Sequence, residues 1–493
     1  MRVTSVDIDA ESGGRFVAPQ VTRRIAKWVA TCSPADVPPQ VFQAARLLTL
    51  DGLGCGIFGA TQPWTRIVTE FVVASGGNAE ASVWGTTSVV PATAAPLANG
   101  TSMHAFEYDD LHPRAVLHAG AQVLPAAFAV AEMQARRAVA SEQPPITELD
   151  LLHAIVLGFE VGARIGLATG TGQLARGFHP SPNTGTFAAA ATACRLLRLD
   201  AERTEHALGI AGSFGGYLMA AQYGAMVKRV HPGHASQSGL TAALLAARGL
   251  TGTEAVLEAP YGGFATTFAD AGGPELEDTT AGLGERWEIP AFSIKYYPCC
   301  GSNHTSLDAW WTILRQHPGI TTDQIHRIDV HCSTLTADHV GWPYKPGSVT
   351  TAQMNLAYCL AAAVVDGRFT VDQVDTDRLA DPAILSLVDR IHIRADPTID
   401  DLGRDRRHHI RLTVTTRDGT TIEADCEHPK GSVDNPLAES EVIDKFRDLA
   451  GRVLAGDAVP ELERRILALG SQTPLDTLAL SALLATGAAP QPK

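Results

Sequence analysis

The segment His409-Ile-Arg-Leu-Thr-Val414, with Thr420-Thr-Ile-Glu-Ala424 after Asp418-Gly419, decides how this chain divides. Both arms alternate and are rich in β-branched residues, and Asp-Gly favours the tight turn of a hairpin. Residues 325–330 and 391–393 are also typical of strands, while residues 351–365 between them follow a helical pattern. Residues 292–435 are therefore predicted to form an α+β unit.

The sequence on either side of this unit is helical. From Val21 to about Ala291, apolar residues recur at three- and four-residue spacing. Helices are predicted around 41–48 and over 90–106, 117–136, 148–167, 184–197, 202–213 and 234–249, with an isolated strand at 81–84. Amphipathic helix returns from Glu439 to about Thr486. The prediction is a mainly α fold: a large helical-bundle domain (1–291 and 436–493) with an inserted smaller α+β lid domain (292–435), meeting across a cleft that favours ligand binding.

Composition narrows the class of protein. A chain of 493 residues exceeds what one hydrophobic core usually organises. The net charge of -14 argues against a nucleic-acid partner. No apolar run is evident that approaches the roughly 20 residues of a membrane span, and Met1 to Arg15 lacks the features of a signal peptide. A cytoplasmic protein with reduced thiols and no membrane partner is expected, since its eight cysteines are scattered.

One motif is misleading. Gly54-Cys-Gly-Ile-Phe-Gly59 matches the dinucleotide fingerprint GxGxxG, which requires a preceding strand. A helix precedes it here, so these glycines are predicted to let a helix pack closely or end. Cys299 and Cys300 are the other weak signal, because two adjacent cysteines without further ligands do not make a metal site.

Polar residues concentrate in four segments. The densest, His104 to His118, holds Glu107, Asp109 and Asp110. It could belong to an active site, to an acidic helix end before Pro113, or to a Mg²⁺ site made by the three carboxylates.

The other three segments each precede a predicted helix or begin the second domain. His179 stands beside a helix N-terminus, which suits a carboxylate ligand, although it could simply cap that turn. Lys228 and Arg229 lie among small and apolar residues, where attraction to an anion is stronger than in water. Lys295, followed by Cys299, Cys300 and His304, could reach the cleft from the opposite wall.

These segments carry a resemblance to a known family. Glu107-Tyr-Asp-Asp-Leu-His, Gly177-Phe-His-Pro, Met226-Val-Lys-Arg-Val-His-Pro-Gly, Lys295-Tyr-Tyr-Pro-Cys-Cys, Gln353-Met-Asn-Leu-Ala-Tyr and Pro429-Lys-Gly-Ser-Val-Asp-Asn-Pro resemble the MmgE/PrpD family, in order over about residues 20–470. The family includes 2-methylcitrate dehydratase, cis-aconitate decarboxylase and iminodisuccinate epimerase. Gln222-Tyr-Gly-Ala, Tyr261-Gly-Gly-Phe and Val340-Gly-Trp are most similar to the fungal decarboxylases. The resemblance implies a helical domain with an α+β lid, usually in a homodimer.

The resemblance also implies a set of site residues. His118, His179, Lys228, Lys295 and Tyr358 match active-site positions of the family. Substrate-binding or orienting roles are expected for Glu107, Asp109, Asp110, Leu111, Arg229, Cys300 and His304. Glu107 stands where many members have Asp, Leu111 where many have Thr, and Cys300 where the animal decarboxylase has His.

The expected function is a cofactor-independent lyase without metal, acting on a small polycarboxylate. His118 is the expected general acid or base, and the two lysines are expected to stabilise an enolate. The leading hypothesis for the reaction is decarboxylation of cis-aconitate to itaconate. A 2-methylcitrate-type dehydratase, a dicarboxylate epimerase and an inactive small-molecule-binding homologue are the alternatives.

Overall fold

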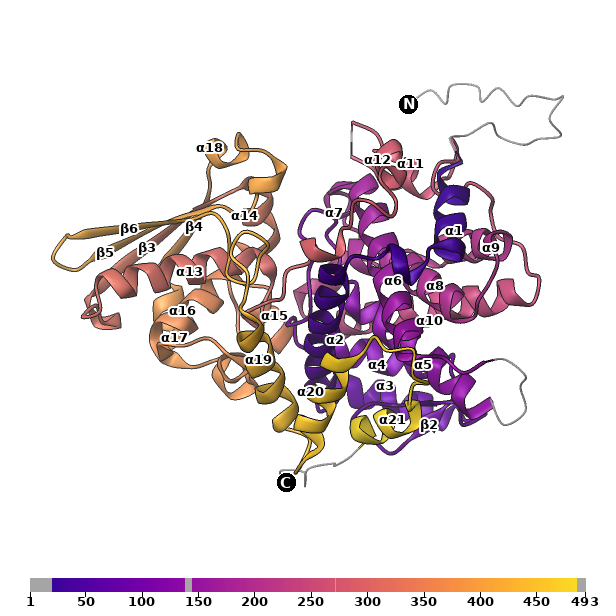
Figure 1. Cartoon of the computed structure of the whole chain (residues 1–493). Coiled ribbons are helices and arrows are strands. Elements are labelled where there is room, and N and C mark those ends of the chain that lie inside the picture. Colours follow the sequence, from indigo (N-terminus) through magenta and orange to yellow (C-terminus); the bar gives the residue numbers. More distant parts are fainter. Residues whose placement is uncertain (1–19, 138–143, 271, 486–493) are drawn as a thin grey trace.

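The computed structural model describes residues 20–137, 144–270 and 272–485 (Figure 1). The N-terminal residues used above to argue against a signal peptide lie outside this range. The first part of the chain is mainly helical. Its helices are α1 (Val21–Thr31), α2 (Pro39–Gly59), α3 (Pro63–Ala74), α4 (Ala95–Met103), α5 (Gly120–Arg137), α6 (Glu148–Thr169), α7 (Gly172–Ala175), α8 (Pro180–Leu196), α9 (Ala201–Ala211), α10 (Val227–Ala247), α11 (Phe264–Phe268) and α12 (Leu276–Thr280). Instead of one predicted strand, a two-residue pair forms between β1 (Ala81–Ser82) and β2 (Val89–Val90).

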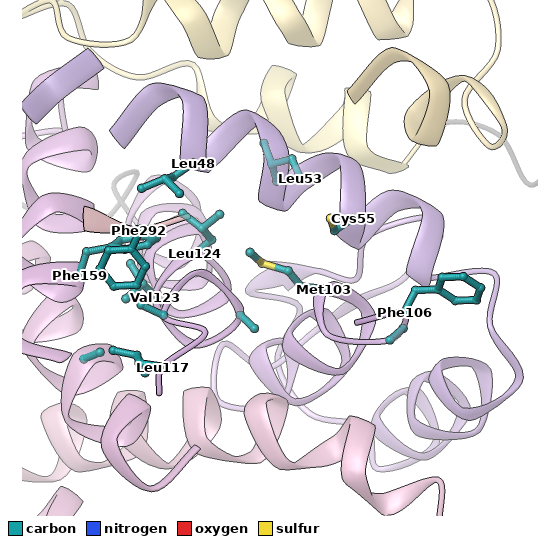
Figure 2. Close-up of a cluster of buried hydrophobic side chains, with 14 of the residues drawn as sticks. Leu48, Leu53, Cys55, Met103, Phe106, Leu117, Val123, Leu124, Phe159 and Phe292 are labelled. Carbon is teal, nitrogen blue, oxygen red and sulfur yellow. The ribbon is translucent and has the colours of Figure 1, made fainter. Parts of the chain in front are cut away.

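Helix α8 lies at the centre of the bundle, packed against α5, α6, α9 and α10. Its alanine-rich sequence allows these helices to approach closely. At Gly239 of α10, an added Cβ would lie 2.4 Å from the carbonyl oxygen of Thr186. The core continues under α2, where Figure 2 shows Leu48 and Leu53 above Leu124 and Met103. Each such buried side chain contributes about 1.5–3 kcal/mol of hydrophobic free energy.

The glycines of the GxGxxG match lie within α2, and the helix ends at Gly59. A Cβ at Gly54 would lie 3.2 Å from the Phe446 ring, one at Gly56 2.8 Å from the Trp84 ring, and one at Gly59 1.8 Å from the carbonyl oxygen of Ser102. The close-packing interpretation of these glycines is therefore confirmed.

The inserted part contains a four-stranded sheet with helices. Its strands are β3 (Ile325–Cys332), β4 (Ile391–Ala395), β5 (Ile410–Thr416) and β6 (Thr421–Cys426), in the order β4-β3-β5-β6. The β5–β6 hairpin is antiparallel, and Gly419 at its turn has a φ of 90°. Only β3 and β4 pair in parallel. The helices are α13 (Gly301–Gln316), α14 (Thr334–Val340), α15 (Val349–Gln353), α16 (Leu356–Asp366), α17 (Pro382–Val388) and α18 (Pro397–Asp400), and α13 packs against β5, β6 and α16.

The chain then returns to the helical bundle through α19 (Glu439–Gly451), α20 (Ala458–Ala468) and α21 (Thr477–Ala485). Helices α19 and α20 pack against α2, and α21 packs against α5 (Figure 1). Lys445 of α19 forms a buried ion pair with Asp51 of α2 at 2.7 Å. The predicted mainly α fold with a smaller α+β part is confirmed, while the residue bounds set for the domains stay predictions.

In the part of the chain that the structure describes, two helices, α2 and α6, are long and apolar enough by composition to cross a membrane, which differs from the sequence expectation. However, 67% of the apolar window of α2 and 94% of that of α6 are buried inside the protein. Their apolar character is accounted for by the central position of both helices in the bundle.

Candidate active site

A small cavity of about 70 Å³ lies between the helical bundle and the α+β part. Its bundle wall includes Glu107, Leu111, Val116, His118, His179 and Lys228. Its other wall includes Lys295, Cys300, Ser302, His339, Arg407 and His408. The cavity is smaller than the roughly 150 Å³ that holds a benzene molecule.

Three buried cations surround the carboxylate of Glu107. Its Oε1 contacts the Lys228 ammonium and lies 2.6 Å from Nη1 of Arg229. Its Oε2 lies 3.3 Å from Nζ of Lys295, which also donates to the Glu107 carbonyl at 3.1 Å. Gln353 accepts a second bond from Arg229 at 2.7 Å. We call Glu107, Lys228, Arg229 and Lys295 the cation cluster.

Burial and mutual attraction oppose each other in the cation cluster. Burial favours the neutral acid, yet Lys228, Lys295, His104 and Arg229 hold the pKa of Glu107 well below its usual range. Burial lowers the pKa of Lys228 despite the attraction of Glu107. At Lys295 the attraction of Glu107 and Asp109 outweighs burial and raises the pKa. With three cations against one carboxylate, the cluster retains positive charge for an anionic ligand.

The backbone beside the cluster is strained. Glu107 has a φ of 54° and Val116 a φ of 51°, in the left-handed region that residues other than glycine seldom adopt and that is rarest for a β-branched residue such as Val116. Both residues line the cavity. Such conformations cost about 1–3 kcal/mol each and concentrate at functional sites, where the surrounding structure holds them in place.

Histidines and one carboxylate lie next to the cluster. Asp109 accepts a hydrogen bond from Nδ1 of His104 at 2.9 Å, and Nδ1 of His118 lies 3.6 Å from the same oxygen. The rings of His104 and His118 are 4.9 Å apart. Burial lowers the pKa of His118 to about 3, so the imidazole is neutral in the unliganded protein. It can therefore accept a proton there.

His179 immediately precedes α8, but its side chain does not cap that helix. It lines the cavity instead, with its Nδ1 3.1 Å from Nδ1 of His231. Burial, together with the charge of Lys228, lowers its pKa well below the usual range. His179 is thus a second neutral imidazole at the site.

Three residues expected at the site lie elsewhere. The Tyr358 hydroxyl is buried and donates to the carbonyl of Gln373 at 2.8 Å. His304 is buried against the Tyr297 ring, 5.2 Å between centroids. Asp110 accepts from the backbone N–H of Gly120 at 3.0 Å, and burial raises its pKa well above the usual value. None of the three lines the cavity, and neither do Asp109 and Arg229, although those two contact residues that do; the predicted site roles stay predictions.

Among the described residues, His104, Asp109 and His118 form the group that could hold a metal ion, with ligand atoms within 4.8 Å of one another. A cation there would have to displace the His104–Asp109 hydrogen bond and would face Lys295, whose charge acts on both Asp109 and His118. In the described part of the chain, the carboxylates of Glu107, Asp109 and Asp110 do not gather into the alternative Mg²⁺ site. Glu107 pairs with the three cations, and Asp110 accepts from the backbone N–H of Gly120.

Several residues near the cavity were not singled out from the sequence. Gln353 bridges Arg229 to two backbone carbonyls, those of Phe106 and Pro298. Arg407 and His408 reach the cavity from the turn before β5, and His339 from α14. A buried glutamine inside the recognised Gln353–Tyr358 phrase was an available signal, whereas His339 and Arg407 have no sequence pattern that separates them from surface residues.

Comparison with known proteins agrees with this architecture. The MmgE/PrpD N-terminal domain matches residues 23–276, and the MmgE/PrpD C-terminal domain matches residues 297–469. The chain is 36% identical to the cis-aconitate decarboxylase-like protein oryM of Aspergillus oryzae, over 94% of this chain and 97% of that protein. It is 33% identical to cis-aconitate decarboxylase of Aspergillus terreus, over 97% of each chain, and 28% identical to the human enzyme of that name, over 90% of each. Two matching domains in sequence, over a fold of the expected class, show that this chain belongs to the MmgE/PrpD family.

Proposed function

We propose that this protein is a carboxy-lyase that converts cis-aconitate, or a close analogue, to itaconate and CO₂. The observation that carries the proposal is the cation cluster, buried beside the neutral imidazoles of His118 and His179. The names of the relatives, a cis-aconitate decarboxylase-like protein and cis-aconitate decarboxylases, support the same reaction.

The chemistry requires a site for a transient carbanion. When CO₂ leaves the methylene carbon of cis-aconitate, its bonding electrons form a new double bond, and the old double bond shifts its electrons to the distal carbon. That carbon is next to a carboxylate, which shares the charge as an enolate. A proton then binds the distal carbon and gives itaconate.

Lys228 and Lys295 are suited to hold this charge. They approach the cavity from opposite walls, one from α10 and one from the segment before α13. Preorganised cations in a water-poor site stabilise an enolate more strongly than water does, commonly by about 3–4 kcal/mol for one contact. Their role is electrostatic, and neither amine needs to form a covalent bond.

His118 is the proposed proton carrier. It is neutral without ligand, and the carboxylates of a bound substrate would raise its pKa and favour protonation. Asp109, 3.6 Å from Nδ1 of His118, would stabilise the imidazolium that forms. The proton would then pass to the distal carbon.

Apolar residues supply the second requirement of a decarboxylase. Leu111, Val116, Leu174, Met219 and Met354 line the same cavity. A carboxylate placed against such a surface is poorly solvated, whereas the CO₂ that it becomes is neutral. This apolar lining favours decarboxylation over expulsion of hydroxide, which needs an acid at the leaving group.

The test is proton NMR of the purified, chelator-treated protein, incubated separately with cis-aconitate and 2-methylcitrate. Vinyl signals of itaconate support the proposal. Consumption of 2-methylcitrate alone would establish a dehydratase instead, and no reaction with either compound would overturn the proposal. A homodimer, a cytoplasmic location and independence from cofactors remain predictions.

A further inference from the structure

One nucleophilic side chain at the cavity has no part in the proposed reaction. The thiol of Cys300 lies on the wall opposite Glu107, at the residue that precedes the 16-residue helix α13. Its exposed fraction is 8%, and the chain contains seven other cysteines. Among the residues described, Cys300 is the cysteine that lines this cavity. Its neighbour Cys299 is fully buried behind it.

Charged groups around Cys300 favour the thiolate. Burial alone would raise the pKa of this thiol, but a hydrogen bond and the charge of His339, helped by Lys295, lower it to about 7. Glu107 acts in the opposite direction, and Arg229 also lies within electrostatic reach. The amino end of α13 adds a partial positive charge.

Burial acts in the opposite direction on six of the other seven cysteines, whose thiol pKa values are raised. Burial raises the pKa of Cys299 well above its usual value and that of Cys194 to about 12. Cys426, which is partly exposed, also has a pKa raised to about 12. Cys300 therefore differs from these six thiols because it combines thiolate character at neutral pH with access from a cavity.

We propose that Cys300 is a covalent modification site for electrophilic carboxylic acids, which the cation cluster draws into the cavity beside the Cys300–His339 pair. The ligand class is an α,β-unsaturated or α-halogenated carboxylate. The carboxylate binds toward Lys228 and Lys295, and its electrophilic carbon faces the sulfur. Modification fills the cavity and blocks substrate.

The covalent step is a conjugate addition. The thiolate sulfur forms a bond to the β-carbon of the unsaturated acid while the electron pair of the carbon–carbon double bond moves to the α-carbon. The α-carbon then takes a proton from water, so that a saturated thioether results and no oxidant is consumed. Itaconate has such a double bond, so in this one respect the inference rests on the proposed function: the product of the enzyme would inactivate it slowly.

The first experiment uses iodoacetate, from which the thiolate displaces iodide. The full-length protein is treated with iodoacetate or with neutral iodoacetamide, and labelled peptides are measured by mass spectrometry, with glutathione as the reference thiol. Cys300 should be labelled before Cys426. Its preference for iodoacetate over iodoacetamide should exceed that of glutathione by about tenfold or more, because clustered cations concentrate an anionic reagent. Propane-1,2,3-tricarboxylate, which is saturated and unreactive, should protect it.

Variants of single residues test whether the labelling depends on Cys300 and His339. Cys300→Ser should abolish the fast labelling, whereas Cys426→Ser should leave it unchanged. His339→Gln should slow labelling at pH 7 and restore it at pH 9, because the thiol then ionises without the imidazole. A merely structural effect of His339 would lower the rate at both pH values.

Two outcomes would overturn the inference. In the first, Cys300 reacts no faster than Cys426. In the second, the preference of Cys300 for iodoacetate over iodoacetamide equals that of glutathione. A second arm incubates the protein with itaconate and looks for its adduct on Cys300; absence of the adduct refutes the slow self-inactivation. Iodoacetate labelling needs no turnover. Fast labelling of Cys300 in a protein that is inactive on cis-aconitate would therefore contradict the proposed function while supporting the modification site.

Discussion

Glu107→Gln offers the sharpest test of the cation cluster. The change preserves shape but removes the one carboxylate that faces Lys228, Arg229 and Lys295. At an effective dielectric constant of about 20, two unit charges 3.3 Å apart, as for Lys295 and Glu107, attract by about 5 kcal/mol. Loss of one partner of a buried ion pair costs about 3–5 kcal/mol net. At about 2.1 cal/mol/K of unfolding entropy per residue, a chain of 493 residues loses about 1 °C per kcal/mol, so Tm should fall by about 3–5 °C.

The pH dependence of this loss has a definite sign. Burial already lowers the pKa of Lys228, and without the attraction of Glu107 that pKa should lie further below its unfolded value, so the unfolded chain binds more protons. Stability of the variant therefore rises with pH. Glu107 in the parent has a depressed pKa, and its contribution is fully present above its unfolded value of 4.5 and is lost only as the pH falls through the folded one. The Tm difference should consequently shrink between pH 6.5 and 9.

The assay is differential scanning fluorimetry at one scan rate, with and without propane-1,2,3-tricarboxylate. An anion that enters the vacated position should stabilise the variant more than the parent, and 100-fold excess over Kd adds about 2.7 kcal/mol. Glu107→Asp, which retains the charge, and Glu423→Gln on the exposed face of β6 are the controls. A Tm for Glu107→Gln within 2 °C of the parent, with equal ligand shifts in both, would refute this account of the cluster.

Three other predictions address catalysis and packing. Lys228→Met should lower kcat/KM for itaconate formation by about 10²–10³-fold, measured by NMR, whereas Lys345→Met on the surface should leave it unchanged; equal rates would refute the electrostatic role. Between pH 8 and 5, titration of His118 should not lower kcat/KM, since the pKa of His118 in the free protein is about 3. An inflection of kcat/KM near pH 6.5 in the parent that is absent in His118→Gln would contradict this. Gly59→Ala, whose Cβ would collide with a carbonyl, should lower the free energy of unfolding by about 1–3 kcal/mol. Gly451→Ala, whose Cβ meets no atom within 4 Å, should lower it by nothing. Similar Tm values for the two variants would refute the packing argument.

Local patterns were sufficient to predict the fold because they reflect local physics. Alternation and Asp-Gly identified the β5–β6 hairpin, since its register depends on a turn of a few residues. Stretches rich in alanine and other small or apolar residues indicated α6 and α8, whose burial requires such residues on nearly every face. The short β1–β2 pair was less predictable, because two-residue strands carry almost no pattern.

Site residues could be predicted where they lie in a sequence motif, but not where contacts between distant residues determine their position. Lys228 and Lys295 were matched by their phrases and do line the cavity. Tyr358 was matched equally well, yet its hydroxyl donates to the backbone carbonyl of Gln373, and the residue does not line the cavity. The left-handed backbone of Glu107 and Val116 could not have been anticipated, since neither residue type favours it. Val116 lies in a tight turn closed by backbone hydrogen bonds between His112 and Leu117, which no sequence motif indicated.

Glu107 also changes what substrate binding has to accomplish. Cations that bind an anionic substrate must be buried, and removing three of them from water during folding would be prohibitively costly without a counter-charge. Glu107 supplies that charge before substrate arrives, and it fixes Lys228, Arg229 and Lys295 at one point. An arriving carboxylate therefore meets cations that are already desolvated and oriented, and it competes with a single side chain instead of with bulk water. Reorganisation during the reaction is reduced accordingly, which is the condition under which fixed charges stabilise an enolate most strongly.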